Sequence, residues 1–195
     1  MLNFNTPNNK EHPENLRFNI LQEIVNSLNS EVLENNKPTY KGKFEIVQIG
    51  NQFELNHTTT EMDENKKSDI DPTQGDFKKI LTLLNLIKRN ITNKPLDIFE
   101  IINQMNVEMG KNGEEKLKFL NSLDTLKLIE RVRDLIGNDI QIKSKIDTEG
   151  NFIYSTAFQS KENGDKRETT KIIKEYPDKE FRDLCKKIIT LFSQN

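Results

Sequence analysis

The residue types that most often carry out chemistry are few in this chain and lie far apart. Its 195 residues include one cysteine, Cys185, and two histidines, His12 and His57. Zinc sites combine several cysteine or histidine ligands at short spacings, which these three residues do not offer. A lone cysteine cannot form an intrachain disulfide. We therefore assign no catalytic residue, no metal ligand and no cofactor from the sequence.

Cys185 and His57 both fall in patterns typical of a protein core. The cysteine belongs to a series at the spacing of a helical stripe: Phe181, Leu184, Cys185, Ile188 and Phe192. This stripe predicts a small buried side chain, because a reactive thiolate needs an adjacent base and an accessible, electropositive pocket. His57 lies on the apolar face of an expected strand, and we interpret it as a core histidine.

Two short acidic motifs, Asp69-Ile70-Asp71 and Asp147-Thr148-Glu149, resemble calcium loops only superficially. Neither has the glycine at loop position six or the glutamate at position twelve that an EF-hand requires. The eight glycines form no Walker A motif and no Rossmann fingerprint, and no serine stands in a G-x-S-x-G elbow. An acid–base pair assembled from distant carboxylates stays open as an alternative.

The composition indicates a soluble chain. Charged residues make up 31% of it with a net charge of −2, and apolar residues only 33%. No apolar run approaches the roughly 20 residues that cross a bilayer. The start, Met1-Leu2-Asn3-Phe4, has neither the basic residues nor the apolar run of a secretory signal. We expect a cytoplasmic protein that does not insert into membranes.

Nucleic-acid binding is disfavoured by the balance of charge. Between residues 138 and 176, seven acidic residues offset seven basic ones. Phosphate binding depends on excess positive charge gathered on one face, and no motif places aromatic residues among these lysines.

Apolar periodicity predicts helices through much of the chain. The expected helices cover about 14–34, 72–91, 95–110 and 114–136, with a last one capped by Asp178. In the segment 114–136 the apolar residues change face midway. That helix either kinks near Asp124 or is buried on two sides.

Three glycine-tipped turns predict β-hairpins and set their registers. Gly50-Asn51 suits a two-residue type II′ turn. Gly150 and Gly164 each suit the left-handed position of a three-residue loop, because that loop length collects the apolar residues on one face. The predicted pairs are Phe44–His57 and Ile46–Leu55, then Ile140–Phe158, Ile142–Thr156 and Ile146–Phe152, then Tyr154–Ile172 and Thr156–Thr170.

This order of elements predicts an α+β fold, because strand–helix–strand alternation is absent. We expect an antiparallel sheet, built from an N-terminal β-hairpin and a C-terminal three-stranded meander, packed with about five helices. The predicted parts are a flexible tail over 1–13 and a single α+β domain over 14–195. That domain contains a mobile acidic loop over 58–71 and a helical section over 72–136.

The outer face of the meander is the candidate binding surface. The expected register places Lys145, Ile153 and Ile173 in one row and Lys143, Ser155 and Lys171 in the next. Small central side chains between lysines and isoleucines favour docking of a partner segment. A helix of the same chain covering this face is the competing interpretation.

These observations favour a non-catalytic protein-binding module of the adaptor, assembly-chaperone or inhibitor type, which acts through a sheet face or a helical groove. The expected partner is another protein with an acidic and partly apolar segment, and a homodimer is left open. The alternative is an enzyme or a nucleic-acid-associated factor whose site forms from scattered residues.

Overall fold

The computed structural model describes residues 13–35, 42–50, 52–59, 77–92, 94–109, 111–137, 139–161 and 168–193. The helices of these ranges are α1 (Pro13–Asn35), α2 (Phe77–Thr92), α3 (Ile98–Met105), α4 (Lys111–Leu120), α5 (Thr125–Ile136) and α6 (Asp178–Phe192). The strands are β1 (Gly42–Ile49), β2 (Gln52–Thr59), β3 (Gln141–Ile146), β4 (Phe152–Lys161) and β5 (Glu168–Pro177). The predicted α+β class is confirmed, with the hairpin and the meander forming two separate antiparallel sheets.

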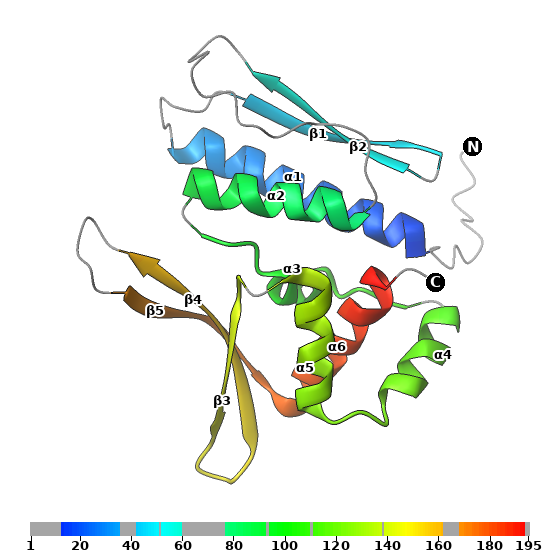
Figure 1. Ribbon diagram of the computed structural model, residues 1–195, viewed down its shortest axis with the longest axis vertical. Coiled ribbons are helices and arrows are strands. Elements are labelled where there is room, and N and C mark those ends of the chain that lie inside the picture. Colours follow the sequence, from blue (N-terminus) through cyan, green and yellow to red (C-terminus); the bar gives the residue numbers. More distant parts are fainter. Residues whose placement is uncertain are drawn as a thin grey trace, which may run out of the picture.

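The β1–β2 hairpin covers the pair of helices α1 and α2 (Figure 1). Its predicted register is confirmed, with Phe44 opposite His57 and Ile46 opposite Leu55. Gly50 has a φ of 62°, a left-handed angle that glycine adopts without strain. The side chain of Asn29 on α1 ties the hairpin down, because its amide donates to Phe44 O at 2.9 Å and accepts from Phe44 N at 3.1 Å.

The last helix, α6, forms the centre of the second half of the molecule. The ring of Phe181 stacks on Phe99 of α3 at 5.1 Å and on Tyr154 of β4 at 4.9 Å, measured between ring centroids. Phe181 and its neighbour Cys185 are completely buried. One helix face therefore packs the meander and the helical section into a common core, as the apolar stripe predicts.

The helix predicted over 114–136 is two helices, α4 and α5. Asp124 ends the interruption as the N-cap of α5, where its side chain accepts from Lys127 N at 2.9 Å. The two apolar stripes thus belong to separate helices with different directions, so the break near Asp124 is the alternative that the structure bears out.

The predicted capping role of Asp178 is wrong. The N-cap of α6 is Pro177, which has no side-chain cap, and Asp178 lies in the first turn. Its carboxylate instead accepts from the hydroxyl of Thr125 at 3.0 Å. Arg182 donates to the same hydroxyl at 3.0 Å, so the start of α5 is fastened to α6 by side chains from both helices.

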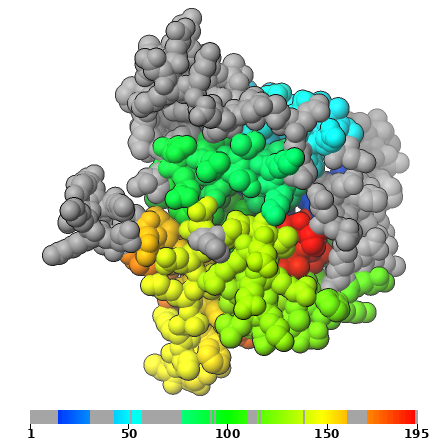
Figure 2. Space-filling view, viewed as in Figure 1, coloured from blue at the N-terminus to red at the C-terminus, as the bar shows by residue number. Residues whose placement is uncertain are grey.

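The first hairpin of the meander has the predicted register. Ile142 lies opposite Thr156 and Ile146 opposite Phe152, while Gly150 adopts a φ of 85°. The end of this hairpin projects from the body (Figure 2), and Ile146 is 62% exposed there.

The register predicted for the second hairpin is wrong. Tyr154 lies opposite Tyr176 rather than Ile172, and Thr156 lies opposite Lys174. The last described pair of the ladder is Lys161 with Glu168, whereas the predicted three-residue loop would pair Lys161 with Asp165, and a bulge shifts the register again between Thr156 and Ala157. A glycine-containing loop signal does not reveal the bulge, and so it does not fix the register of the whole ladder.

Several sequence-based predictions lie outside the described residues. They are the tail up to residue 12, most of the acidic loop, the helix start at Asp71-Pro72 and the conformation of Gly164. The division of the chain into a tail and one domain stays a prediction.

Candidate functional site: a groove between the meander and two helices

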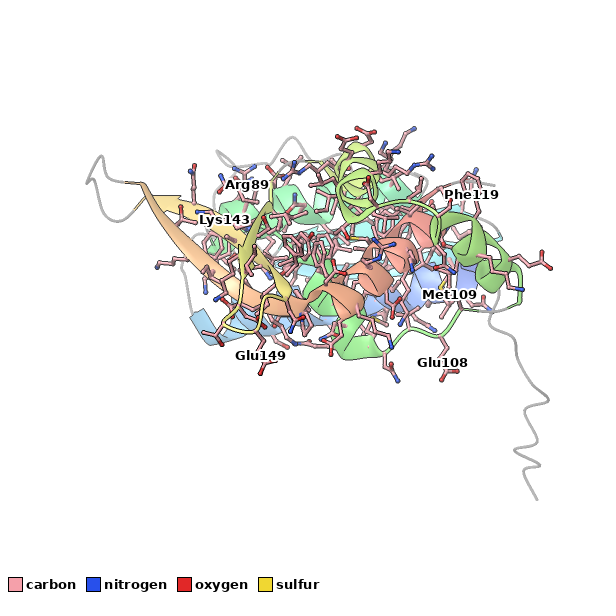
Figure 3. The ribbon with its side chains drawn as sticks, turned by 90° about the horizontal axis from the view of Figure 1, so that it is seen from below. Arg89, Glu108, Met109, Phe119, Lys143 and Glu149 are labelled. Carbon is pink, nitrogen blue, oxygen red and sulfur yellow. The ribbon has the colours of Figure 1, made fainter. Side chains whose placement is uncertain are left out.

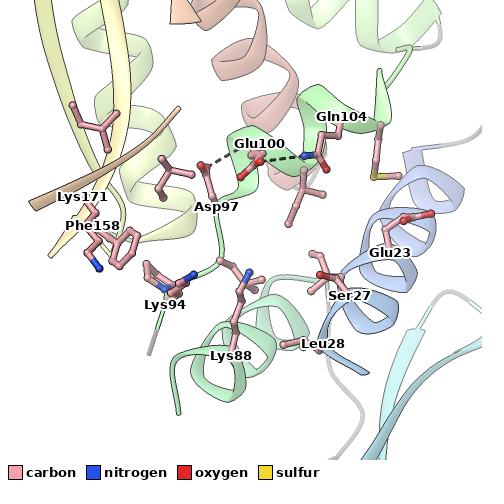
Figure 4. Close-up of a pocket in the computed structure, with 17 residues that line it drawn as sticks. Glu23, Ser27, Leu28, Lys88, Lys94, Asp97, Glu100, Gln104, Phe158 and Lys171 are labelled. Atoms are coloured by element: carbon pink, nitrogen blue, oxygen red, sulfur yellow. Dashed lines mark hydrogen bonds between the residues drawn. The ribbon is translucent and has the colours of Figure 1, made fainter. Parts of the chain in front are cut away.

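A cavity of about 810 Å³ lies between α1, α3 and the end of the meander (Figure 4). Its lining comes from α1, α2, the segment 94–97, α3, β4 and β5. We call this cavity the groove. It brings together segments that are far apart in the sequence, so its composition follows from the tertiary fold rather than from any local motif.

Apolar side chains form much of the inner wall. Three of the lining side chains are at least 90% buried: Leu28 of α1, Leu96 of the segment before α3, and Phe158 of β4. Ile101 and Met105 of α3 are partly buried at the same cavity. A partner that covers this wall would bury apolar surface, and burial of apolar surface gives most of the free energy of association.

Asp97 anchors the floor of the groove. It is the N-cap of α3, and its Oδ1 accepts from Phe99 N at 3.1 Å and from Glu100 N at 3.3 Å. Its Oδ2 accepts from the hydroxyl of Thr156 on β4 at 2.9 Å. The carboxylate thus fixes the start of α3 against the central strand of the meander.

Burial raises the pKa of Asp97 above its ordinary value, although the hydrogen bond from Thr156 opposes this shift. A raised pKa in a cleft is a common sign of acid–base catalysis. Here both carboxylate oxygens already accept hydrogen bonds within the protein. The arrangement favours a structural role for Asp97.

Tyr176 is a second buried group with a shifted pKa, and it lies within electrostatic range of Asp97 and Glu100. Its side chain is 1% exposed, and its hydroxyl has no hydrogen-bond partner among the described residues. Burial raises the pKa of Tyr176 well above its ordinary value, and the charges of Asp97 and Glu100 raise it further. The phenol therefore stays protonated at neutral pH and cannot act as a base.

The charged residues of the groove are unevenly distributed. Lys88, Lys94 and Lys171 line the side formed by α2 and β5, whereas Glu23 lies on α1 (Figure 4). We call the three lysines the basic end. Glu100 lies between the two sides and accepts from Gln104 at 3.1 Å. A ligand with a negative charge beside apolar groups complements this pattern.

The structure separates the six residues that the sequence groups as a binding surface. Lys171 and Ile173 line the groove, and the other four are not among its lining residues. Lys143 lies on β3, at the opposite edge of the sheet from β5 (Figure 3). The predicted rows are wrong because the true register places Glu175, not Lys171, opposite Ser155.

The remaining four residues form a face whose charge is partly neutralised. Lys145 Nζ lies 2.7 Å from Glu175 Oε1. Ser155, between their strands, is only 6% exposed, and its hydroxyl donates to Lys143 O at 3.4 Å. Ile153 lies in the same row as Lys145 and is partly buried.

Sequence reasoning missed Asp97, Glu100 and the lysines of α2 and the segment after it. Asp97 carries a usable signal, because an aspartate followed three residues later by glutamate is a capping-box pattern at a helix start. Lys88 and Lys94 carry none, since only the tertiary fold brings α2 and the segment after it to the groove.

Other kinds of site have little support in the described part of the chain. No three His, Cys, Asp or Glu side chains there are grouped so that they could hold a metal ion. Burial raises the pKa of the Cys185 thiol to about 12, so it is protonated at neutral pH. Every helix described is too short or too polar to cross a bilayer.

Comparisons of the chain with protein-family models, curated proteins and solved structures found no match.

Proposed function

We propose that this chain is a non-catalytic protein-binding module that holds an acidic, partly apolar segment of another protein in the groove. The observation that carries the proposal is the basic end: three lysines from three separate elements line the same cavity as a wall of buried apolar side chains. The cavity volume of about 810 Å³ falls in the range of ligand-binding clefts, roughly 300–1,000 Å³.

The proposal moves the binding surface from the outer sheet face to the groove. On the outer face, Lys145 is paired with Glu175 and Ser155 is covered. Lys171 and Ile173 keep their proposed role as binding residues, now as part of the groove. The expected chemistry of the partner, acidic and partly apolar, is unchanged.

Two features of the groove argue against the alternatives. The buried carboxylate of Asp97 is fully engaged in hydrogen bonds, which disfavours a catalytic acid or base. The groove is lined by three carboxylates, Glu23, Asp97 and Glu100, as well as by its three lysines. This balance gives the groove too little net positive charge for a nucleic-acid site. We keep the cytoplasm as the proposed location.

Selection from a random peptide display library tests the proposal. The bait is the full chain, and the groove variant Lys94→Glu/Lys171→Glu is the comparison. We expect enriched peptides that combine acidic and apolar residues, and whose affinity for the groove variant falls at least about tenfold because like charges meet at the basic end.

The matched control is Lys143→Glu/Lys179→Glu, which makes the same charge change at two exposed lysines outside the groove. It should keep the affinity of the wild-type chain. Circular dichroism establishes that both variants fold. Failure to enrich any peptide, or equal loss of affinity in both variants, would contradict the proposed function.

A further inference from the structure

Strand β5 lies at an edge of its sheet. The order of the strands is β3-β4-β5, so β5 pairs with β4 on one side, and no described strand pairs with its other side. An edge strand presents a row of backbone N–H and C=O groups that can pair with another extended chain.

The groove runs along this open edge. Three consecutive residues of β5, Lys171, Ile172 and Ile173, line it. Successive side chains of a strand point to opposite faces of its sheet, so a cavity on one face would contact only every second residue. A cavity that contacts three consecutive residues therefore lies most readily along the edge of the strand. In Figure 3, β5 lies on the side of the meander toward α1 and α3, which form the opposite wall.

The edge carries a local irregularity at the same place. Ala157 pairs with Ile172 and Thr156 with Lys174, so Ile173 is the extra residue of a bulge. Ile172 is 56% exposed beside it. Bulges redirect side chains at sheet edges, and they often lie next to binding sites.

Resting on the proposed function, we infer that the partner segment binds in an extended conformation and adds to β5 as a fourth strand of the meander. Backbone hydrogen bonds to β5 then supply affinity, while alternate side chains of the segment supply specificity.

The two faces of β5 set the sequence pattern of the segment. Lys171 pairs with Phe158, which is buried at the groove, so its side chain lies on the groove face. Ile172 pairs with Ala157 and lies on the other face. A neighbouring strand shares these faces, so residues of the segment on the groove face meet both Lys171 and the apolar wall. This favours acidic and apolar residues on that face of the segment and a further apolar residue beside Ile172 on the other face.

Backbone methylation of the bound peptide tests strand addition directly. The probe is a synthetic peptide with the sequence most enriched in the selection described above. Two derivatives carry N-methyl groups on alternate residues. One derivative is methylated at the odd-numbered positions of the peptide and the other at the even-numbered positions. In an added strand, the amides of one parity face β5 and those of the other face away. We expect one derivative to lose about 100-fold in affinity and the other to bind within a few-fold of the parent.

The outcomes separate this inference from the proposed function. If the parent peptide binds the groove but both derivatives bind equally well or equally poorly, the peptide does not add as a strand, and only the inference is wrong. If no enriched peptide depends on Lys94 and Lys171, the proposed function fails and the inference falls with it.

A second copy of the chain is the other occupant that could pair with this edge. Sedimentation velocity distinguishes a dimer from a monomer, and we expect a monomer. Hydrogen exchange then reports on the edge strand, and we expect the β5 amides of this monomer to become protected when the peptide is added. A dimer that dissociates on Ile172→Lys replacement would overturn the assignment to a partner segment.

Discussion

Lys145 Nζ lies 2.7 Å from Glu175 Oε1, although their strands, β3 and β5, are separated by β4. Glu175 is opposite Ser155, and Lys145 is opposite Ile153, so the ion pair spans the central strand diagonally. It occupies the part of the outer face that the sequence assigns to docking. The pair exists because the register of β4 and β5, with its bulge, brings Glu175 rather than Lys171 into this position.

This ion pair should contribute little to stability. The side chains of Lys145 and Glu175 are 57% and 42% exposed, so water screens their attraction. We expect Lys145→Ala to change the free energy of unfolding by less than about 1 kcal/mol, as measured in urea. Glu175→Ala is the matched variant. A loss above about 2 kcal/mol in either would mean that the pair fixes the sheet.

Asp97→Ala should destabilise the protein much more. The change removes the N-cap of α3 and leaves the buried hydroxyl of Thr156 without its acceptor. Together these losses predict a decrease of about 2–4 kcal/mol in the free energy of unfolding. Asp124→Ala, which removes the more exposed cap of α5, should lose about 0.5–2 kcal/mol. Equal losses in the two variants would contradict the anchoring role of Asp97.

The pH dependence of stability should reveal the burial of Asp97. Burial raises the folded-state pKa of Asp97 above its ordinary value, so folding favours the protonated form. The stability that this group contributes is present below the unfolded pKa and is lost as the pH rises through the folded pKa. We expect wild type to lose stability relative to Asp97→Asn between pH 4 and pH 7, in urea titrations of both proteins. A constant difference would mean that folding does not shift the pKa of Asp97, and a difference that grows in favour of wild type would mean that folding favours the charged carboxylate; either result would contradict this prediction.

Tyr176→Phe should leave stability unchanged or raise it. The buried hydroxyl has no described partner, and a buried unsatisfied hydroxyl costs about 1–3 kcal/mol. Removing it keeps the ring beside Phe181, whose centroid is 6.1 Å away. Tyr176→Leu, which removes the ring, should be clearly destabilising. If Tyr176→Phe lowered the unfolding free energy by more than about 1 kcal/mol, the hydroxyl would have a partner after all.

Local signals in the sequence predict the elements and two of the three hairpins. Gly50 and Gly150 stand where the backbone has positive φ, and these positions fix the registers that the structure confirms. The third register failed for a physical reason. The observed register, with its bulge at Ile173, places Tyr176 opposite Tyr154, where both rings pack near Phe181. That aromatic contact depends on the position of α6, and the residues of a turn carry no information about that position.

The candidate site was only partly predictable. The sequence groups Lys171 and Ile173 with residues of β3 and β4 on the outer face, whereas in the structure these two residues line the groove and have other cross-strand neighbours. The groove depends on the tertiary arrangement that places α1 and α3 across a cavity from β5. Apolar periodicity shows that a helix buries one face, but it does not show which sheet edge that face meets.

The most direct test of the central claim is to locate a bound peptide by NMR. The full chain, labelled with ¹⁵N, is titrated with the most enriched peptide. We predict that the largest amide shifts fall in the segments 94–101 and 171–173, which contribute most of the lining outside α1. The amides of β3, on the far edge of the sheet, should change little. Shifts concentrated at Lys143, Lys145 and Ser155 would place binding on the outer sheet face and would contradict the groove.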